Sequence, residues 1–124
     1  MKSKPTLEQR RSQHAWNAVT VVQKERNKKD LAGHAKKLPM RIKAAGLGQA
    51  LAFLESKLEK NNLLHVLLSE WVLKERRIQV DQQATLLASI VHGNSDTLRR
   101  STEEVLAWLE WFNRFAEAEG LKSE

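Results

Sequence analysis

Apolar residues recur three and four positions apart along almost the whole chain, and strict alternation over the length of a strand is hard to find. The stretch with Leu47, Leu51, Leu54 and Leu58 shows the pattern most simply, with spacings of four, three and four. Such a periodicity places an apolar stripe on each helix and predicts an all-α fold. It predicts about six helices, over approximately residues 6–27, 30–45, 47–58, 63–74, 81–93 and 95–120.

Helix boundaries are indicated by capping residues and by proline and glycine. Thr6 and Gln9 form a capping-box pattern that opens the first helix. Pro39 interrupts the second segment, either as a kink or as a helix start. Asp81 is expected to cap the fifth helix, and Gly93 to close it.

The last helix carries a second capping-box pattern at Ser101 and Glu104, which allows a break at that point. The apolar rows of all the helices together predict the buried residues. These are Ala15, Ala18, Val19, Val22, Leu31, Ala35, Leu38, Ile42, Leu47, Leu51, Leu54, Leu58, Leu64, Val66, Leu67, Leu68, Trp71, Val72, Leu86, Leu87, Ile90, Val91, Leu98, Val105, Leu109, Phe112 and Ala116.

Size and composition predict one folded domain. The chain has 124 residues, of which 41% are hydrophobic and 29% charged. We expect a single helical domain over residues 1–124, with frayed ends at about 1–5 and 120–124. The chain has no cysteine, which excludes a disulfide framework, a thiolate zinc site and a cysteine nucleophile. No apolar run approaches the roughly 20 residues of a membrane span, so we expect a soluble, cytoplasmic protein without a membrane partner.

Positive charge is concentrated early in the chain. Residues 1–43 include 12 basic and 3 acidic side chains, whereas residues 44–124 include 9 basic and 12 acidic ones. A basic segment on a neutral body suggests an anionic partner, either a nucleic acid or an acidic protein surface. The alternative is that these residues only keep a helical protein soluble.

The second helix is predicted to have a cationic side. Lys36, Lys37, Arg41 and Lys43 fall opposite its apolar stripe. Phosphates attract such a row without reading sequence, and a basic stripe on the first helix favours the same interpretation. A solvated helix face explains the pattern equally well.

The four histidines give little sign of catalysis. His14, His34, His65 and His92 lie far apart, without ligand spacing, so we expect surface or capping roles, no metal site and no cofactor. His14 shares its stripe with basic residues, which leaves acid/base ribonuclease chemistry as a weak alternative. We do not expect an enzyme.

The apolar face of the last helix is wide, because Trp108, Trp111 and Phe115 flank its inward row. Both indoles are expected in the core or at its edge. The alternative is that part of this face contacts another subunit.

Two segments together resemble a known family. One carries Lys37-Leu38-Pro39 ahead of Gly46-Leu47 within residues 35–54, and the other carries Trp111-Phe112-Asn113-Arg114-Phe115-Ala116 within residues 101–118. They resemble the small all-helical subunit, the fifth, of the Cmr complex, the type III-B CRISPR RNA-silencing effector. The resemblance covers most of the chain and is loose between Arg76 and Arg100.

The resemblance implies a non-catalytic scaffold subunit. Its partners would be other Cmr subunits, further copies of itself by stacking, and guide and target RNA, recognised by charge and shape. The residues that match the family's basic region and terminal motif are Lys36, Lys37, Arg41, Lys43 and Arg114. Charge placement alone adds Arg10, Arg11, Arg99 and Arg100 as candidate RNA contacts. Roles in the fold or in stacking are expected for Gly46, Leu47, Leu51, Phe53 and Trp111.

Two alternatives of other kinds remain. One is a helical protein–protein adaptor that binds no RNA. The other is the small subunit of the related type III-A complex, which is also basic and helical.

Overall fold

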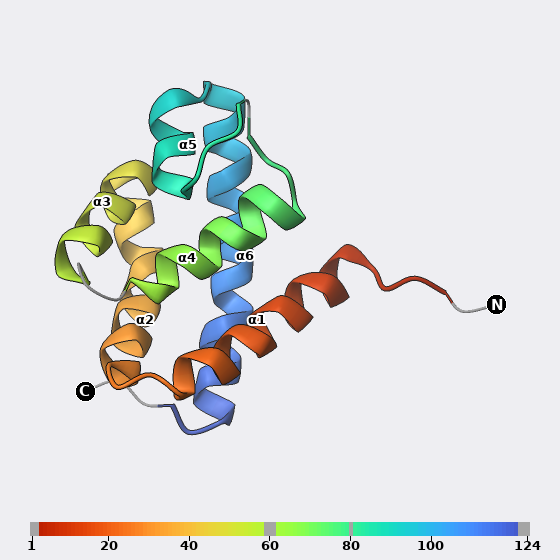
Figure 1. The fold of residues 1–124 in the computed structure, drawn as a ribbon, viewed down its shortest axis with the longest axis vertical. Coiled ribbons are helices and arrows are strands. Elements are labelled where there is room, and N and C mark those ends of the chain that lie inside the picture. Colours follow the sequence, from red (N-terminus) through yellow and green to blue (C-terminus); the bar gives the residue numbers. More distant parts are fainter. Residues whose placement is uncertain (1–2, 59–61, 80, 122–124) are drawn as a thin grey trace.

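The computed structural model describes residues 3–58, 62–79 and 81–121, and every regular element in this part of the chain is a helix (Figure 1). The elements follow in the order α1 (Leu7–Gln23), α2 (Lys28–Ala45), α3 (Leu47–Lys57), α4 (Leu63–Ser69), η1 (Glu70–Glu75), α5 (Leu86–His92) and α6 (Ser95–Ala118). The π-helix η1 directly continues α4. The predicted all-α fold is confirmed. The predicted frayed ends lie partly outside the described residues.

The long helix α6 is the element on which the others are assembled. It packs against α1, α2 and η1, while α3 joins α2 to α5 (Figure 1). At the centre, Trp71, Trp108 and Phe112 are fully buried. Most of the predicted core is confirmed, including all four predicted residues of α1 and the leucine row of α3. None of the described helices has an apolar stretch long enough to cross a membrane.

Three predicted core residues lie at the surface instead. Val66, Val91 and Leu98 are 60%, 67% and 40% exposed. On α4 and α5 the two valines lie on the side of the helix away from buried residues such as Leu64 and Leu68 of α4 and Leu86 and Ser89 of α5. At the start of α6 the inward positions are Thr97 and Ser101, which places Leu98 on the flank.

The first helix begins as predicted but ends earlier. The hydroxyl of Thr6 accepts the N–H of Gln9 at 3.0 Å, and the Gln9 side chain accepts the N–H of Thr6 at 2.8 Å, which completes the capping box. The helix stops at Gln23 rather than near residue 27. The next two N–H groups bond to carbonyls three residues back, which tightens the chain into a turn.

One predicted helix cap is wrong, and the break that the sequence allowed in the last helix is absent. Thr85, not Asp81, caps α5, because its hydroxyl accepts the N–H of Ala88 at 3.2 Å. The second capping box is absent, since α6 runs unbroken through Ser101 and the carboxylate of Glu104 binds arginines instead. Gly93 ends α5 as predicted.

Pro39 lies inside α2, which runs from Lys28 to Ala45, so it is not a helix start. Because proline has no N–H, the carbonyl four residues earlier, that of Ala35, loses its helical partner. Ala35 is fully buried. The side-chain amide of Asn113 on α6 donates to that carbonyl at 3.0 Å. This bond satisfies the orphaned carbonyl and ties α2 to α6.

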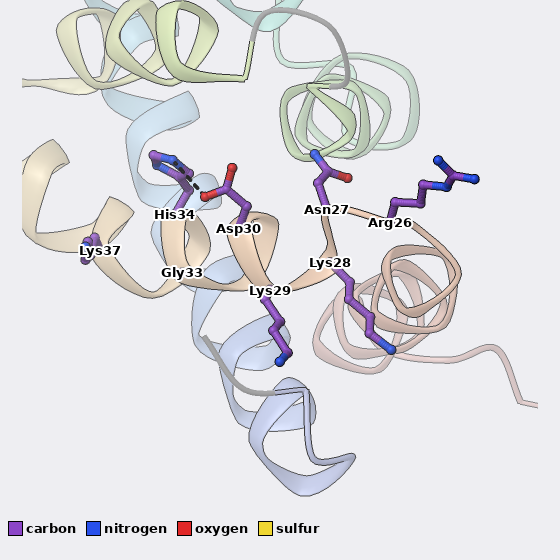
Figure 2. Close-up of a pocket in the computed structure, with 8 residues that line it drawn as sticks. All are labelled: Arg26, Asn27, Lys28, Lys29, Asp30, Gly33, His34 and Lys37. Carbon is purple, nitrogen blue, oxygen red and sulfur yellow. Dashed lines mark ion pairs between the residues drawn. The ribbon is translucent and has the colours of Figure 1, made fainter. Parts of the chain in front are cut away.

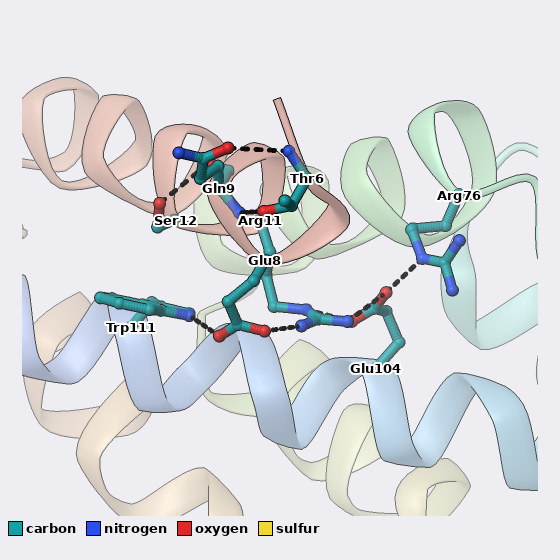
Figure 3. A network of polar contacts seen from close by, with 8 residues as sticks. All are labelled: Thr6, Glu8, Gln9, Arg11, Ser12, Arg76, Glu104 and Trp111. Carbon is teal, nitrogen blue, oxygen red and sulfur yellow. Dashed lines mark hydrogen bonds and ion pairs between the residues drawn. The ribbon is translucent and has the colours of Figure 1, made fainter. Parts of the chain in front are cut away.

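A buried carboxylate ties α1 and the end of η1 to α6 (Figure 3). Glu104 accepts two hydrogen bonds from Arg11, at 2.6 and 3.1 Å, and one from Arg76. Arg11 also binds Glu8 at 2.6 Å. Burial alone raises the pKa of Glu104, but the hydrogen bonds and charges of the two arginines outweigh it and hold that pKa below its usual range.

We predict that Asn113→Ala lowers the free energy of unfolding by about 1–3 kcal/mol, because the Ala35 carbonyl is left buried without a partner. In a Pro39→Ala background the substitution costs less, since a backbone N–H at position 39 can then bond to Ala35. Urea denaturation of the two single variants and the double variant measures the coupling. An equal cost in both backgrounds contradicts the assignment.

We also predict that Glu104→Gln lowers the free energy of unfolding by about 3 kcal/mol at neutral pH, because two arginines lose their buried counter-charge. The folded pKa of Glu104 lies below the unfolded one, so its stabilisation is complete above about pH 5 and is lost as pH falls through the folded value. The stability curves of the two proteins should therefore converge in acid. A constant gap down to about pH 3 would contradict this account.

Candidate nucleic-acid interface

The helix α2 separates its apolar side from its charges, as predicted. Its stripe of apolar residues is buried against the core. Lys36, Lys37 and Lys43 are exposed, and Arg41 is half-buried. None of the three lysines forms an ion pair with a described residue, so their charges are available to a ligand. The exposed Met40 lies between two rows of cations. Lys36 and Lys43 lie on one side of it, and Lys37 and Arg41 lie on the other.

One flank of α2 borders α6 and brings two predicted residues together. Lys43 and Arg114 line the same groove of about 530 Å³, with Pro39 and Leu106 among its apolar walls. The acidic residues of this groove, Glu110 and Glu117, also lie on α6. The groove is therefore mixed in charge, with one cation on each helix.

The other flank of α2 borders α3 and adds two residues that the sequence did not single out as RNA contacts. The guanidinium carbon of Arg41 lies 4.3 Å from the ring centroid of Phe53, and the Lys57 ammonium lies 5.4 Å from the same centroid. Phe53, expected in the fold or in stacking, is 38% exposed. In the sequence, this pair could have been found from its spacing, because residues 53 and 57 are four apart and lie beside the leucine row of α3.

His34 supports Arg41 from within α2. The guanidinium donates to Nδ1 of His34 at 3.2 Å, and Nε2 lies 3.9 Å from Asp30. Burial lowers the pKa of His34; Asp30 opposes this, and the charges of Arg41, Lys37 and Lys57 lower it further. The imidazole is therefore neutral at neutral pH and can accept the Arg41 hydrogen bond.

A third cationic region lies at the connection between α1 and α2, around a pocket of about 460 Å³. Figure 2 shows Arg26, Lys28 and Lys29 at its rim, with side chains that spread apart rather than converge. Lys37 lines the same pocket and connects it with the other exposed cations of α2. The region extends the positive surface without forming a closed site.

The arginines added from charge placement lie elsewhere. Arg11 is held in the Glu104 cluster, and the exposed Arg10 donates to the Glu75 carbonyl at 3.4 Å. Arg99 is bound by Asp96 at 2.8 Å and Glu103 at 3.2 Å, and these acids raise its pKa. Arg100 is exposed on the same early turns of α6. All four lie on α1 or α6, and the contacts of Arg10, Arg11 and Arg99 are with residues outside α2.

His65 is buried, contrary to the expected surface or capping role. Its Nδ1 contacts the Glu55 carboxylate, and its Nε2 accepts the N–H of Leu87 at 3.2 Å. The ring thereby joins α4 to α3 and to the first turn of α5. Such a tertiary contact leaves no periodic signal in the sequence.

His14 is also largely covered and fixed at both ring nitrogens. Nδ1 accepts from the Trp108 indole at 2.9 Å, and Nε2 lies 2.6 Å from Glu70. Its ring packs 5.2 Å from that of Trp71. The geometry gives His14 the role of a connector between tryptophans. Among residues 3–58, 62–79 and 81–121, no three His, Asp or Glu side chains are placed to hold a metal ion.

The aromatic residues of α6 occupy the core and its edge, as expected for both indoles. Trp108 is buried and stacks on Phe112, whereas Trp111 is partly exposed and donates to Glu8 at 2.6 Å. Phe115 meets Trp16 of α1 edge-to-face at 5.0 Å. Trp16 is 45% exposed and extends this aromatic seam to the surface.

Comparisons with known proteins agree with one another. Residues 7–119 match the family model described as "CRISPR-associated protein (Cas_Cmr5)". The chain is 35% identical over 108 residues to the CRISPR system Cmr subunit Cmr5 of Thermus thermophilus, covering 86% of this chain and 90% of that protein. It also resembles the crystal structure of a CRISPR-associated Cmr5 family protein from Thermus thermophilus, with a TM-score of 0.74, 31% identity and coverage of 93% and 97%.

The placement of the cations makes a prediction about stability. Arg11→Gln should lower the free energy of unfolding by about 2 kcal/mol, because it removes a partner of a buried carboxylate. Lys36→Gln should change it by less than about 0.5 kcal/mol. Urea is the denaturant of choice, since guanidinium chloride would screen the charges. Equal losses in both variants would contradict the division into structural and available cations.

Proposed function

This chain belongs to the Cmr5 family of CRISPR-associated proteins, and on that premise we propose that it is a non-catalytic scaffold subunit of the type III-B Cmr complex, acting in the cytoplasm. Its α2 face, defined here as Lys36, Lys37, Arg41, Lys43 and the adjacent Arg114 of α6, holds backbone phosphates of guide or target RNA. Sequence recognition is left to base pairing between the two strands.

The observation that carries this proposal is the contrast between two kinds of cation. Arg11 and Arg76 neutralise a buried carboxylate, whereas Lys36, Lys37 and Lys43 of α2 have no acidic partner among the described residues. Several unpaired cations on one rigid helix attract a polyanion and bind phosphates without reading bases. The Asn113 bond to Ala35 keeps that helix in place against α6.

A scaffold role is supported by what the histidines do. The best acid/base candidate, His14, has Nδ1 bonded to an indole and Nε2 on Glu70. A general base needs a ring nitrogen within reach of the substrate's proton. The hydrogen bonds of His14 instead hold α1 against α6 and η1.

Contacts with other Cmr subunits and with further copies of this chain form the second part of the proposal. Large apolar side chains are also exposed on other helices, among them Trp16 of α1 and Val91 of α5. Aromatic residues of this kind are enriched where proteins meet. The exposed end of the Trp16 and Phe115 seam is the surface we assign to these contacts.

The test of the RNA contact uses the full-length chain and a labelled single-stranded RNA, with binding followed by fluorescence anisotropy at several salt concentrations. The triple variant Lys36→Gln, Lys37→Gln, Lys43→Gln should bind more weakly, and its log–log salt slope should be smaller by about 2. The matched control Lys24→Gln, Lys74→Gln, Arg77→Gln removes the same charge from other sites and should keep most of the slope.

Two outcomes would overturn the RNA contact. If both triple variants lose affinity equally, net charge and not the α2 face explains binding. If neither variant changes affinity or slope while Cmr subunits still co-purify from nuclease-treated lysate, the chain is a protein–protein adaptor.

A further inference from the structure

A half-exposed phenylalanine lies among cations on the α3 flank of α2. Phe53 is 38% exposed, although the leucines beside it in α3 are fully buried. Arg41 lies over its ring at 4.3 Å from the centroid, and Lys57 approaches at 5.4 Å. An exposed aromatic ring beside two cations is suited to a ligand that has both a flat face and negative charge.

Two contacts hold the Arg41 guanidinium in place, one with the Phe53 ring and one with His34. The phenyl ring attracts the guanidinium from one side. The neutral His34 accepts its N–H at Nδ1, at 3.2 Å. Arginine is weakly hydrated and planar, so a guanidinium fixed in this way costs little further entropy when a second flat group contacts it. The pair is therefore organised before any ligand arrives.

Two further cations lie close to the pair. Lys57 follows Phe53 by one helical turn on α3, and Lys37 precedes Arg41 by one turn on α2. Both are exposed, and both act on the charge environment of His34. The flexible stem of Lys57 allows its ammonium group to move from the ring toward a phosphate.

We propose that Phe53 and Arg41 form a stacking platform for one unpaired nucleobase of single-stranded RNA, with Lys37 and Lys57 binding the phosphates on either side of it. This inference rests on the proposed function and makes it more specific, because it assigns one edge of the α2 face to base contact. An acidic peptide would use the cations but leave the exposed ring without a role.

The platform has a consequence for the form of RNA that binds. Bases in a duplex are already stacked on their neighbours and offer only phosphates and sugars to this surface. A base in a single strand can lie flat on an aromatic ring or a guanidinium, whatever its identity. The chain should therefore prefer single-stranded RNA to duplex RNA of the same length.

The experiment compares three probes of equal length on the full chain: a single-stranded RNA, an RNA duplex and an abasic ribose-phosphate strand. Phe53→Leu keeps an apolar side chain but removes the ring, and should weaken single-strand binding about tenfold. It should leave abasic binding and the salt slope unchanged. Phe53→Tyr retains the ring and should bind like the parent chain.

A spectroscopic readout makes the test independent of affinity. A 2-aminopurine base in the single strand should lose fluorescence on binding the parent chain, because stacking quenches it. Arg41→Lys keeps the positive charge but removes the planar guanidinium group, and should reduce this quenching. Absence of quenching with the parent chain would overturn the platform, even if Phe53→Leu proved too unstable to study.

The failures of the two proposals can be told apart. If the lysine variants of α2 weaken RNA binding while Phe53→Leu binds base-bearing and abasic strands like the parent chain, only the stacking platform is wrong. If the parent chain binds none of the three probes at low salt, both proposals are wrong. If it binds none of these probes but does bind an acidic peptide, the flank is a protein contact.

Discussion

The hydrogen bond from Asn113 to the carbonyl of Ala35 is the constraint on which the candidate interface depends. A proline in the middle of a helix normally ends or bends it, because the carbonyl one turn earlier loses its donor. Here α6 supplies that donor, and α2 continues as one helix to Ala45. The cations before and after Pro39 consequently lie on one continuous helix. The bond also joins the two segments that resemble the family, since Pro39 belongs to one and Asn113 to the other.

The second constraint is the division of the cations into those paired with a buried carboxylate and those exposed to water. The carboxylate of Glu104 is buried, so it must be paired, and Arg11 and Arg76 are drawn inward to meet it. These arginines hold three elements together. Lys36, Lys37 and Lys43 of α2 have no such counter-charge among the described residues, and their mutual repulsion is weak because they are exposed to water. A protein that keeps several unpaired cations on one face retains a favourable site for a polyanion.

The sequence predicts what local periodicity controls. The helices, their inward rows and the Thr6 capping box follow from spacing, because each depends on residues within one or two turns. The residues left open whether the chain is a type III-B or a type III-A small subunit. The family match identifies it as a type III-B (Cmr) subunit. The cationic side of α2 is likewise a property of one helix.

What the sequence could not predict depends on contacts between distant elements. Glu104 has the spacing of a capping residue, yet its partners lie 93 and 28 positions away. His65 carries no local sign that it bonds to the start of α5. The pairing of Arg41 with Phe53 appears only when α2 and α3 lie side by side. Periodicity fixes which side of a helix is apolar, but not which neighbour a polar side chain will meet.

The central claim is that RNA lies along α2 and its border with α3 in the assembled complex. The most direct measurement is photocrosslinking of target RNA carrying 4-thiouridine to the reconstituted Cmr complex, with the cross-linked peptides of this chain mapped by mass spectrometry. The account predicts cross-links within residues 36–57. Cross-links confined to α1, η1 or α5, or none from a complex that retains its RNA, would contradict it.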